Sequence, residues 1–320
     1  MAKYTKLGAE ATETKGWFRA HKWLLLRRLS QIGILLLFLL GPLGITLGIE
    51  QIWILKGNLA SSLLLDTVPM TDPFLLLQIL AAGFIPISIV VLGAIIVTAF
   101  YLLVGGRAYC SWVCPVNIVT DAANWLREKL GIKASTRFSR NTRYWMLGMV
   151  LVLSAVTGNM AFELLNPVSM VHRGIIFSVH NPGISVGEGI AWVGVGIAWT
   201  VVIGIFLFDL FVAKRGWCSH LCPMGAMYGL IGKLSPVRVR ADRRSACDDC
   251  MECFAVCPEP QVIKPALKGA NKGIGPVILA GECTNCGRCI DICAEEVFHF
   301  GTRFNNVEKV ESVKGSAQQV

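Results

Sequence analysis

Four long apolar stretches dominate the pattern of hydrophobic and polar positions along the chain. Each is about 20 residues long, the length that an α-helix needs to cross the hydrocarbon core of a bilayer. They cover approximately residues 29–49, 83–104, 144–165 and 190–212. The pattern therefore predicts an all-α membrane bundle of four transmembrane helices within residues 29–240, preceded by a polar segment at residues 1–28.

Basic residues are distributed unevenly around these stretches. Residues 1–30 and the loop 105–143 carry seven Lys or Arg each, whereas the loops 50–82 and 166–189 carry one each. Because cytoplasmic loops of membrane proteins are enriched in Lys and Arg, both basic segments are expected in the cytoplasm. A multi-pass protein with cytoplasmic N- and C-termini follows from this distribution.

A short cysteine motif, CxxxCP, follows the second and the fourth apolar stretch. Residues 110–116 read CSWVCPV and residues 218–224 read CSHLCPM. Two apolar stretches and one motif form a unit that recurs 108 residues later, from Cys110 to Cys218. This recurrence indicates a two-fold internal repeat of the membrane bundle.

A helix is expected directly after each motif, because proline is favoured at the first helical position. After Cys114 the apolar residues keep a spacing of three to four, and Gly131 is the expected stop. This helix is predicted to lie on the membrane surface, with Arg127 and Lys129 directed to the lipid headgroups.

Composition supports a membrane protein with a separate polar domain. The chain is 54% hydrophobic and 16% charged, with net charge +9, whereas soluble domains carry about 25% charged residues. The basic excess flanks the apolar stretches and no nucleic-acid-binding motif occurs, which excludes nucleic acid as a partner. Residues 241–300 instead carry nine acidic and six basic residues. We expect an α+β domain at residues 241–305 and a disordered tail at residues 306–320.

Eight of the twelve cysteines form two closely spaced groups within this domain. Each group has the ligand spacing of one half of a bacterial ferredoxin that binds two [4Fe–4S] clusters, where the fourth cysteine of each group ligates the other cluster. The first cluster is then assigned to Cys247, Cys250, Cys253 and Cys293, and the second to Cys283, Cys286, Cys289 and Cys257. A zinc site or a disulfide knot fits this double spacing poorly.

The spacer of 25 residues between Cys257 and Cys283 is long for a compact ferredoxin. We expect it to form a loop that meets the membrane or a partner.

The combination of these features resembles the NapH family, the ferredoxin-type membrane subunits of periplasmic nitrate reductase systems. The segments RRLSQIG, TDPFLLLQ, GRAYCSWVCPVN, NPVSMVHRG and WCSHLCPMGA carry the resemblance together with the two cysteine groups. It implies a quinol-oxidising subunit in the bacterial inner membrane. Electrons would pass from membrane quinol to a periplasmic iron–sulfur partner and cytochromes, and from there to a nitrate reductase.

The residues alone reach only a membrane-bound iron–sulfur electron carrier, so other functions stay open. Related membrane ferredoxins act in nitrous oxide reduction, methylamine utilisation and oxidase assembly. The main alternative is a membrane ferredoxin that reduces a thiol, metal or cluster during maturation of another respiratory enzyme. A scaffold with structural clusters is the third reading.

Quinol oxidation releases protons, so acceptors near the outer face are candidates for catalysis. An imidazole can accept a proton near neutral pH, which selects His172 in the loop 166–189. Glu163, an acid near the outer end of the third apolar stretch, is the second candidate. Asp66, Asp72 and Gln78 in the first outer loop are weaker candidates.

The CxxxCP motifs together supply four thiols at the cytoplasmic face. Cys110, Cys114, Cys218 and Cys222 could hold a further metal centre shared by the two repeats, with nearby Arg107, Lys214 and Arg215 expected to lower the thiol pKa. Two alternatives are a structural role, in which the motifs pack against the ferredoxin-like domain, and a redox-active dithiol.

Overall fold

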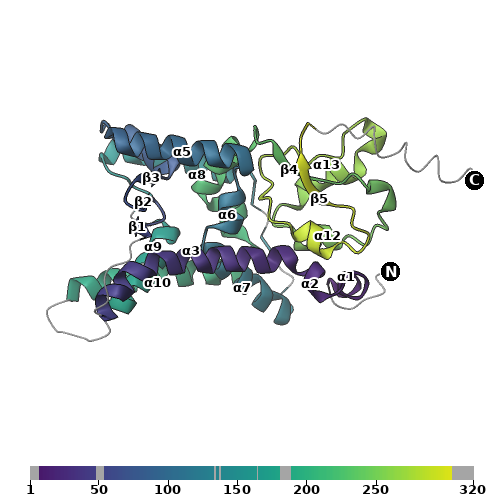
Figure 1. Ribbon diagram of the computed structural model, residues 1–320, viewed down its shortest axis with the longest axis horizontal. Coiled ribbons are helices and arrows are strands. Elements are labelled where there is room, and N and C mark those ends of the chain that lie inside the picture. Colours follow the sequence, from purple (N-terminus) through teal and green to yellow (C-terminus); the bar gives the residue numbers. More distant parts are fainter. Residues whose placement is uncertain are drawn as a thin grey trace, which may run out of the picture.

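The computed structural model describes residues 7–47, 54–132, 135–136, 138–163, 165–180 and 189–304. The predicted disordered tail 306–320 lies outside these residues. Within the described part, long helices occupy one end of the molecule and a small domain with two short strands occupies the other (Figure 1).

Four apolar helices occupy the positions of the four predicted stretches. They are α3 (Lys22–Leu47), α5 (Ser88–Val104), α8 (Thr142–Thr157) and α10 (Gly189–Leu207), the last continuing as a π-helical turn, η2 (Phe208–Val212). Among the described residues one helical segment, Lys22–Leu40, is long and apolar enough to cross a membrane, and three shorter apolar segments lie at Ser88–Val104, Thr142–Thr157 and Ala198–Val212. The four-span bundle therefore stays a prediction.

The third helix ends earlier than the hydrophobic pattern predicts. Gly158, which follows Thr157, adopts a left-handed conformation with φ 62°, a common way for a helix to end. The boundary at residue 165 was therefore wrong, because hydropathy does not register a glycine turn.

The described parts of the two segments predicted as outer loops contain helices and strands that the hydrophobic pattern did not predict, while their side of the membrane stays a prediction. Residues 50–82 contain a three-stranded antiparallel sheet and helix α4 (Pro73–Ala81), and residues 166–189 contain helix α9 (Pro167–His180). The sheet strands are β1 (Leu55–Gly57), β2 (Ser61–Leu64) and β3 (Val68–Thr71). This sheet, which we call the hairpin sheet, packs through β3 against α5, and α9 packs against α3 and α10.

The helices after the CxxxCP motifs pack across the boundary between the two halves of the bundle. Helices α6 (Ala108–Trp112) and α7 (Val116–Lys129) follow α5, and the π-helical turn η3 (Trp217–Leu221) and α11 (Pro223–Gly232) follow α10. Yet α7 packs against α10, and α11 packs against α5 and α8. Each motif is thereby brought to the boundary between the two repeats.

Helix α7 confirms the helix predicted after Cys114 but not the orientation of Arg127. The Arg127 side chain is 2% exposed and donates hydrogen bonds to the backbone carbonyls of Asp209 (3.2 Å) and Leu210 (2.7 Å). These carbonyls belong to the π-helical turn, where the regular helical bonding pattern is interrupted. Arg127 therefore satisfies backbone groups inside the protein and does not reach lipid headgroups.

The C-terminal domain has its own hydrophobic core. Strands β4 (Val237–Arg240) and β5 (His299–Thr302) pair antiparallel, beside α12 (Glu252–Val256), α13 (Ile263–Lys268) and α14 (Arg288–Ile292). Short 3₁₀ turns lie at Arg244–Ala246, Pro260–Val262 and Ala270–Lys272. The long spacer is not an open loop, because α13 within it buries Ile263, Ala266 and Leu267 in this core.

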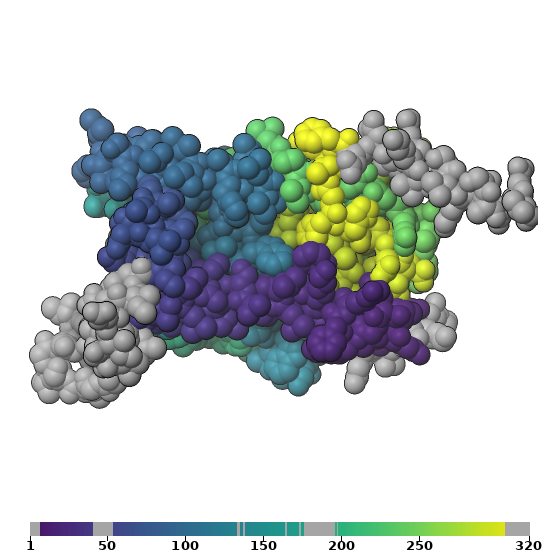
Figure 2. All heavy atoms as spheres, viewed as in Figure 1, coloured from purple at the N-terminus to yellow at the C-terminus, as the bar shows by residue number. Residues whose placement is uncertain are grey.

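The N-terminal segment joins the two ends of the molecule. Helices α1 (Ala9–Lys15) and α2 (Trp17–Ala20) lie beside the C-terminal domain, where Lys15 Nζ donates to the carbonyl of Ile290 (3.0 Å). The carboxylate of Asp291 accepts the backbone N–H groups of Trp23 (3.1 Å) and Leu24 (2.9 Å), and so caps the start of α3. Helix α3, purple in Figure 2, then runs from that domain across the bundle.

Candidate functional site

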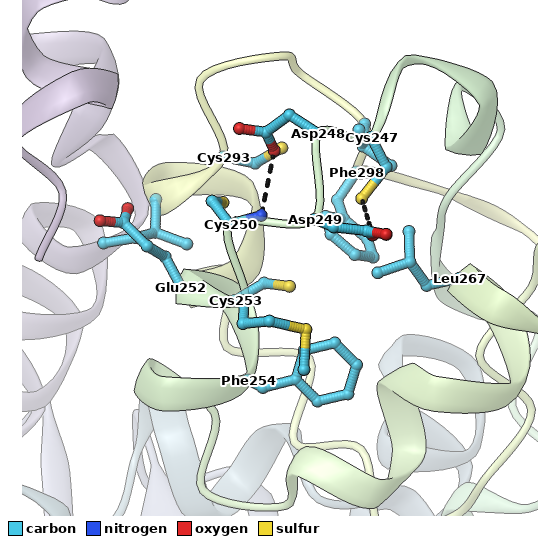
Figure 3. A pocket seen from close by; sticks show the side chains of 13 residues that line it. Cys247, Asp248, Asp249, Cys250, Glu252, Cys253, Phe254, Leu267, Cys293 and Phe298 are labelled. Atoms are coloured by element: carbon cyan, nitrogen blue, oxygen red, sulfur yellow. Dashed lines mark hydrogen bonds between the residues drawn. The ribbon is translucent and has the colours of Figure 1, made fainter. Parts of the chain in front are cut away.

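The four cysteines assigned to the first cluster surround one pocket of the C-terminal domain. Cys247, Cys250, Cys253 and Cys293 line it together with apolar side chains that include Phe254, Leu267 and Phe298. In Figure 3 the four cysteines lie around a common space, although Cys293 is distant in sequence. The pocket therefore gathers the four residues that the spacing assigned to one cluster.

The four cysteines assigned to the second cluster, Cys257, Cys283, Cys286 and Cys289, are more deeply buried. Cys286 and Cys289 are each 8% exposed. Burial raises the pKa of Cys257, Cys283 and Cys289, and the thiol of Cys286 raises each of these pKa values further. Such mutual electrostatic effects require that the four thiols lie near one another.

The two binding loops share an unusual backbone conformation. Asp249 and Met251 in the first loop, and Asn285 and Gly287 at the equivalent positions of the second, all have positive φ between 47° and 72°. Left-handed residues on either side of the second cysteine fold each loop tightly, which brings its thiols together. The two ferredoxin-type cysteine motifs therefore share their backbone conformation as well as their cysteine spacing.

The donor set fits iron–sulfur clusters better than single ions. Among the described residues, no three His, Cys, Asp or Glu side chains converge closely enough to hold one metal ion. A [4Fe–4S] cluster is instead held by four thiolates at its separate corners, as the two cysteine groups provide.

A buried arginine beside the second group supports this fit. The Arg27 side chain is fully buried, and its three guanidinium nitrogens have no hydrogen-bond partner within the described part of the chain. Although burial alone would raise the pKa of Cys286, Arg27 and Arg288 lower it below the ordinary value for a thiol. An unsatisfied buried cation is costly, and a cluster with its negatively charged sulfur ligands would supply the missing counter-charge.

The four cysteines of the CxxxCP motifs also come together, at the boundary of the two repeats. Burial raises the pKa of Cys114 and Cys222, that of Cys222 to about 12, and in both cases the thiol of Cys110 adds to the effect. The pKa of Cys218 is raised by burial, by Asp209, and by the other three thiols. All four thiols therefore lie within electrostatic range, as a shared site requires.

Of the three basic residues expected to lower these pKa values, Arg107 does so. It lowers the pKa of Cys110 and of Cys222, but burial outweighs it and both pKa values are raised. Lys214 lies against Glu128 at 3.4 Å, and Arg215 donates to the carbonyl of Val256 at 2.7 Å. The last two side chains are thus engaged elsewhere.

The residues between the motif cysteines contact the loops of the second cysteine group. Ser111 Oγ donates to the carbonyl of Thr284 (2.7 Å), and Trp112 Nε1 donates to the carbonyl of Asn285 (3.0 Å). Ser219, which occupies the place of Ser111 in the other repeat, donates to the carbonyl of Pro258 (3.1 Å). The two motifs therefore hold both segments that carry the second group.

A buried ion-pair cluster reinforces the same junction. Glu259 Oε1 accepts hydrogen bonds from Arg107 (2.6 Å) and Arg143 (2.8 Å), with all three side chains 2–3% exposed. Arg107 also donates to the carbonyls of Glu282 (2.9 Å) and Cys218 (3.0 Å). Burial opposes ionisation of Glu259, yet Arg107 and Arg143 hold its pKa below the ordinary value.

A second charged cluster centres on Asp121 of α7. Its carboxylate contacts Arg28 and Arg288, the latter at 2.6 Å, and lies 3.9 Å from Arg215. Burial would raise the pKa of Asp121, but Arg288, Arg215 and Arg28 keep it well below the usual range. One carboxylate of α7 thus contacts arginines from α3, from α14 and from the turn between η2 and η3.

His172 and Glu163 both lie in the bundle, on α9 and just before it. His172, on α9, is 5% exposed and packs edge-on against Phe38 with ring centroids 5.0 Å apart. Glu163, in the turn before α9, accepts hydrogen bonds from Ser169 and from Asn166 (3.0 Å). Their part in proton transfer stays a prediction.

Several residues at the junction were missed by reasoning from sequence. Arg27, Ser111, Ser219 and Glu259 each depend on a contact with a segment far away along the chain. One signal was present in the sequence, since a serine follows the first cysteine of both CxxxCP motifs. The others carry no local mark.

Two iron–sulfur families match the chain. A family described as a 4Fe-4S binding domain matches residues 86–133 and 191–241, one match in each repeat. A family described as a 4Fe-4S dicluster domain matches residues 246–310. The double match places a CxxxCP motif inside each copy of an iron–sulfur family.

Curated relatives match nearly the whole chain. The methylamine utilization ferredoxin-type protein MauN of Methylorubrum extorquens is 48% identical over 93% of this chain and 96% of its own length. The ferredoxin-type protein NapH is 44% identical in Haemophilus influenzae, over 93% and 96%, and 43% identical in Escherichia coli, over 94% and 97%. No solved structure matches the chain. The chain therefore belongs to the NapH and MauN family of ferredoxin-type iron–sulfur electron-transfer proteins.

Proposed function

We propose that the protein is a quinol dehydrogenase component of the bacterial inner membrane, with several membrane spans and both termini in the cytoplasm. It takes electrons from membrane quinol and passes them towards a periplasmic nitrate reductase, through an iron–sulfur partner and cytochromes. Two [4Fe–4S] clusters, held by the two cysteine groups, supply one-electron chemistry when bound.

The junction between bundle and C-terminal domain carries the proposal. Ser111, Trp112 and Ser219 of the two CxxxCP motifs donate directly to the loops of the second cysteine group. The four motif cysteines adjoin this contact from the bundle side. The motif thiols and the cluster ligands are thus held in fixed relation between the apolar helices, where a quinol dissolves, and the ferredoxin-like domain. We extend this to a further metal centre at Cys110, Cys114, Cys218 and Cys222.

Methylamine utilisation is the second candidate context. The relative named for it, MauN, is 48% identical, slightly above the 43–44% of the two NapH proteins. The same electron-carrying machinery would then serve maturation or supply of a different enzyme. The identities differ too little to decide between the two contexts.

Quinol-driven reduction of the purified protein tests the proposed function. Electron paramagnetic resonance (EPR) spectra of the anaerobic protein are recorded before and after addition of a short-chain quinol, with dithionite as the control reductant. We expect reduced-cluster signals with both reductants. Signals with dithionite alone would refute quinol oxidation. Rescue of nitrate-dependent or of methylamine-dependent growth in deletion strains then separates the two contexts.

A further inference from the structure

An apolar cavity of about 450 Å³ lies in the bundle beside the first CxxxCP motif. Its walls come from the hairpin sheet and from α3 and α5, including Phe38, Val97 and Met70. Small-molecule sites enclose about 300–1,000 Å³ and combine apolar walls with a few polar groups. The cavity has the size and the lining of such a site.

Its polar groups gather in one part of the wall. Asp72, Tyr101, Tyr109 and Tyr228 all line the cavity. Asp72 caps α4 by accepting the backbone N–H of Phe74 (2.9 Å), and it also accepts a hydrogen bond from the Tyr228 hydroxyl (3.3 Å). The ring of Tyr109 stacks on that of Tyr228, with centroids 4.8 Å apart. The tyrosines therefore hold one another, and the carboxylate, in place.

The hydroxyl of Tyr109 gives the independent sign of a ligand. Tyr109 is 5% exposed, and its hydroxyl finds no hydrogen-bond partner among the residues that the structure describes. Buried hydroxyl groups almost always have a partner, because an unsatisfied one costs about 1–3 kcal/mol. A polar group of a bound molecule would satisfy it.

The cavity adjoins the motif cysteines along the chain. Tyr109 directly precedes Cys110, and Val113, another lining residue, directly precedes Cys114. Tyr228 follows the second motif on α11. A redox molecule in the cavity would therefore lie next to the four thiols and, through them, next to the ferredoxin-like domain.

We propose that this cavity binds the ring of a membrane quinol, with Tyr109 and Asp72 as hydrogen-bond partners of its hydroxyl groups. The apolar walls would hold the start of the isoprenoid tail. This inference rests on the proposed quinol oxidation and gives it a site. His172 and Glu163 then lie behind the cavity: His172 packs against the lining residue Phe38, and Glu163 is electrostatically coupled to Asp72.

Oxidation in this site breaks both O–H bonds of the quinol. The quinol would become a quinone, and its two electrons would pass one at a time to the iron–sulfur clusters that the two sets of four ferredoxin-type cysteines would hold. The Asp72 carboxylate accepts each of the two protons in turn and passes it to water. Tyr109 and Tyr228 orient the ring and keep their own protons. Asp72 therefore acts as a catalytic base, and Tyr109 acts through hydrogen bonding.

Photolabelling of the full-length protein with a photoreactive short-chain quinone tests the site without turnover. Val97→Trp fills the cavity from α5, whereas Ile95→Trp places the same indole side chain on the exposed face of that helix, where Ile95 is 58% exposed. We expect Val97→Trp to lose specific labelling and Ile95→Trp to keep it. Tyr109→Phe removes one hydrogen bond to the ligand and should weaken binding about tenfold.

Two variants, each replacing one aspartate by asparagine, separate proton transfer from quinol binding. Asp72→Asn should slow quinol-driven cluster reduction at least about tenfold, while dithionite-driven reduction is unchanged. Asp66→Asn is the matched control, since Asp66 lies on the same hairpin segment, is exposed and pairs with Lys56 at 2.6 Å. Equal quinol-driven rates in Asp72→Asn and Asp66→Asn would remove Asp72 from the mechanism.

The remaining outcomes distinguish the site from the function. Undiminished labelling in Val97→Trp would overturn the cavity as the binding site, even if the wild type oxidises quinol. Equal displacement of the label by an isoprenoid alcohol without a ring would show a lipid-tail pocket and overturn the ring assignment. Specific labelling without any quinol-driven reduction in the wild type would overturn the proposed function and leave only quinone binding.

Discussion

At the scale of single residues, Arg27 is the clearest example of a side chain on a bundle helix that acts on the C-terminal domain. It stands at the start of a long apolar helix, yet its guanidinium group is fully buried and acts electrostatically on Cys286. A positive charge beside a cluster favours the reduced, more negative state. Arg27 should therefore raise the reduction potential of the second cluster.

We predict that Arg27→Gln lowers that potential by about 60–120 mV, since hydrogen bonds to charged groups contribute about 1.5–3 kcal/mol and one electron corresponds to about 59 mV per tenfold change in equilibrium. The measurement is a redox titration followed by EPR. Arg19→Gln, a change at an exposed basic residue of the same N-terminal segment, should leave the potential unchanged. Identical titrations for both variants would exclude Arg27 as a tuning residue.

The second prediction at this scale concerns the fourth cysteine of each sequence motif, which is assigned to the other motif's cluster. Cys293 lines the pocket of Cys247, Cys250 and Cys253. Cys293→Ser should therefore lose that cluster and retain the other, lowering the iron content by about four per chain. Cys257→Ser should give the reciprocal loss. Iron analysis and EPR of the two variants check this, and loss of the Cys283 cluster in Cys293→Ser would contradict the assignment.

At the scale of elements, the packing of α7 and α11 at the boundary of the repeats explains why the CxxxCP motif occurs twice. One motif offers two thiols, which are too few for a cubane. Helix α7 packs against α10, and α11 packs against α5 as well as α8. Both motifs therefore lie at one boundary, where four thiols meet and where serines on both sides contact the C-terminal domain.

We predict that replacing Cys110, Cys114, Cys218 and Cys222 together by Ser removes metal beyond the two ferredoxin-type clusters and stops quinol-driven electron flow. The double variant Ser111→Ala and Ser219→Ala is the control for metal content. It removes the contacts to the cluster loops and keeps the thiols, so it should keep the metal. Lost flow with unchanged metal would indicate dithiol chemistry. Unchanged flow in the stably inserted cysteine variant would leave a structural role.

At the scale of the whole molecule, buried charges fix the C-terminal domain on the bundle. Glu259, from the long spacer, meets Arg107 and Arg143, which lie 152 and 116 residues away along the chain. Because the three groups are almost fully buried, the stability of the junction is sensitive to the loss of any one of them.

We predict that Glu259→Gln destabilises the junction by about 3–5 kcal/mol, the cost of leaving buried charges unpaired. Thermal unfolding in detergent and limited proteolysis between bundle and domain measure the effect. Glu296→Gln is the matched control, because Glu296 is 53% exposed and lies 3.9 Å from Arg243. A melting temperature for Glu259→Gln equal to that of the control would refute a contribution from the buried cluster.

Topology is the second prediction at this scale. Alkaline phosphatase needs the oxidising periplasm for its disulfides. A fusion after Ser61, in the hairpin sheet, should be active, and a fusion after Lys233, at the end of α11, should be inactive. The reverse pattern would place all twelve cysteines in the periplasm and contradict the assignment of the cytoplasmic face.

Local properties of the chain were readable without a structure. The spacing within each cysteine group reflects the geometry of one tight loop around a cluster, and the positive φ values of Asp249 and Asn285 lie within those loops. The apolar stretches marked all four long helices, because burial or membrane insertion of a helix requires apolar residues along its length. The helix after Cys114 was visible for the same reason, through its periodic apolar residues.

Contacts between distant segments were decided only by the tertiary structure. Hydropathy and charge showed the loop 50–82 as an outer connection, whereas its residues fold into the bundle and bring Asp72 to Tyr228, 156 residues away. Arg127 was assigned to headgroups, whereas it donates to the π-helical turn after α10. Sequence patterns record what a residue does for its own helix or loop. The contacts of α7 and α11 across the repeat boundary, the arginine beside Cys286 and the cavity beside Tyr109 arise from how separate elements pack, which no local pattern encodes.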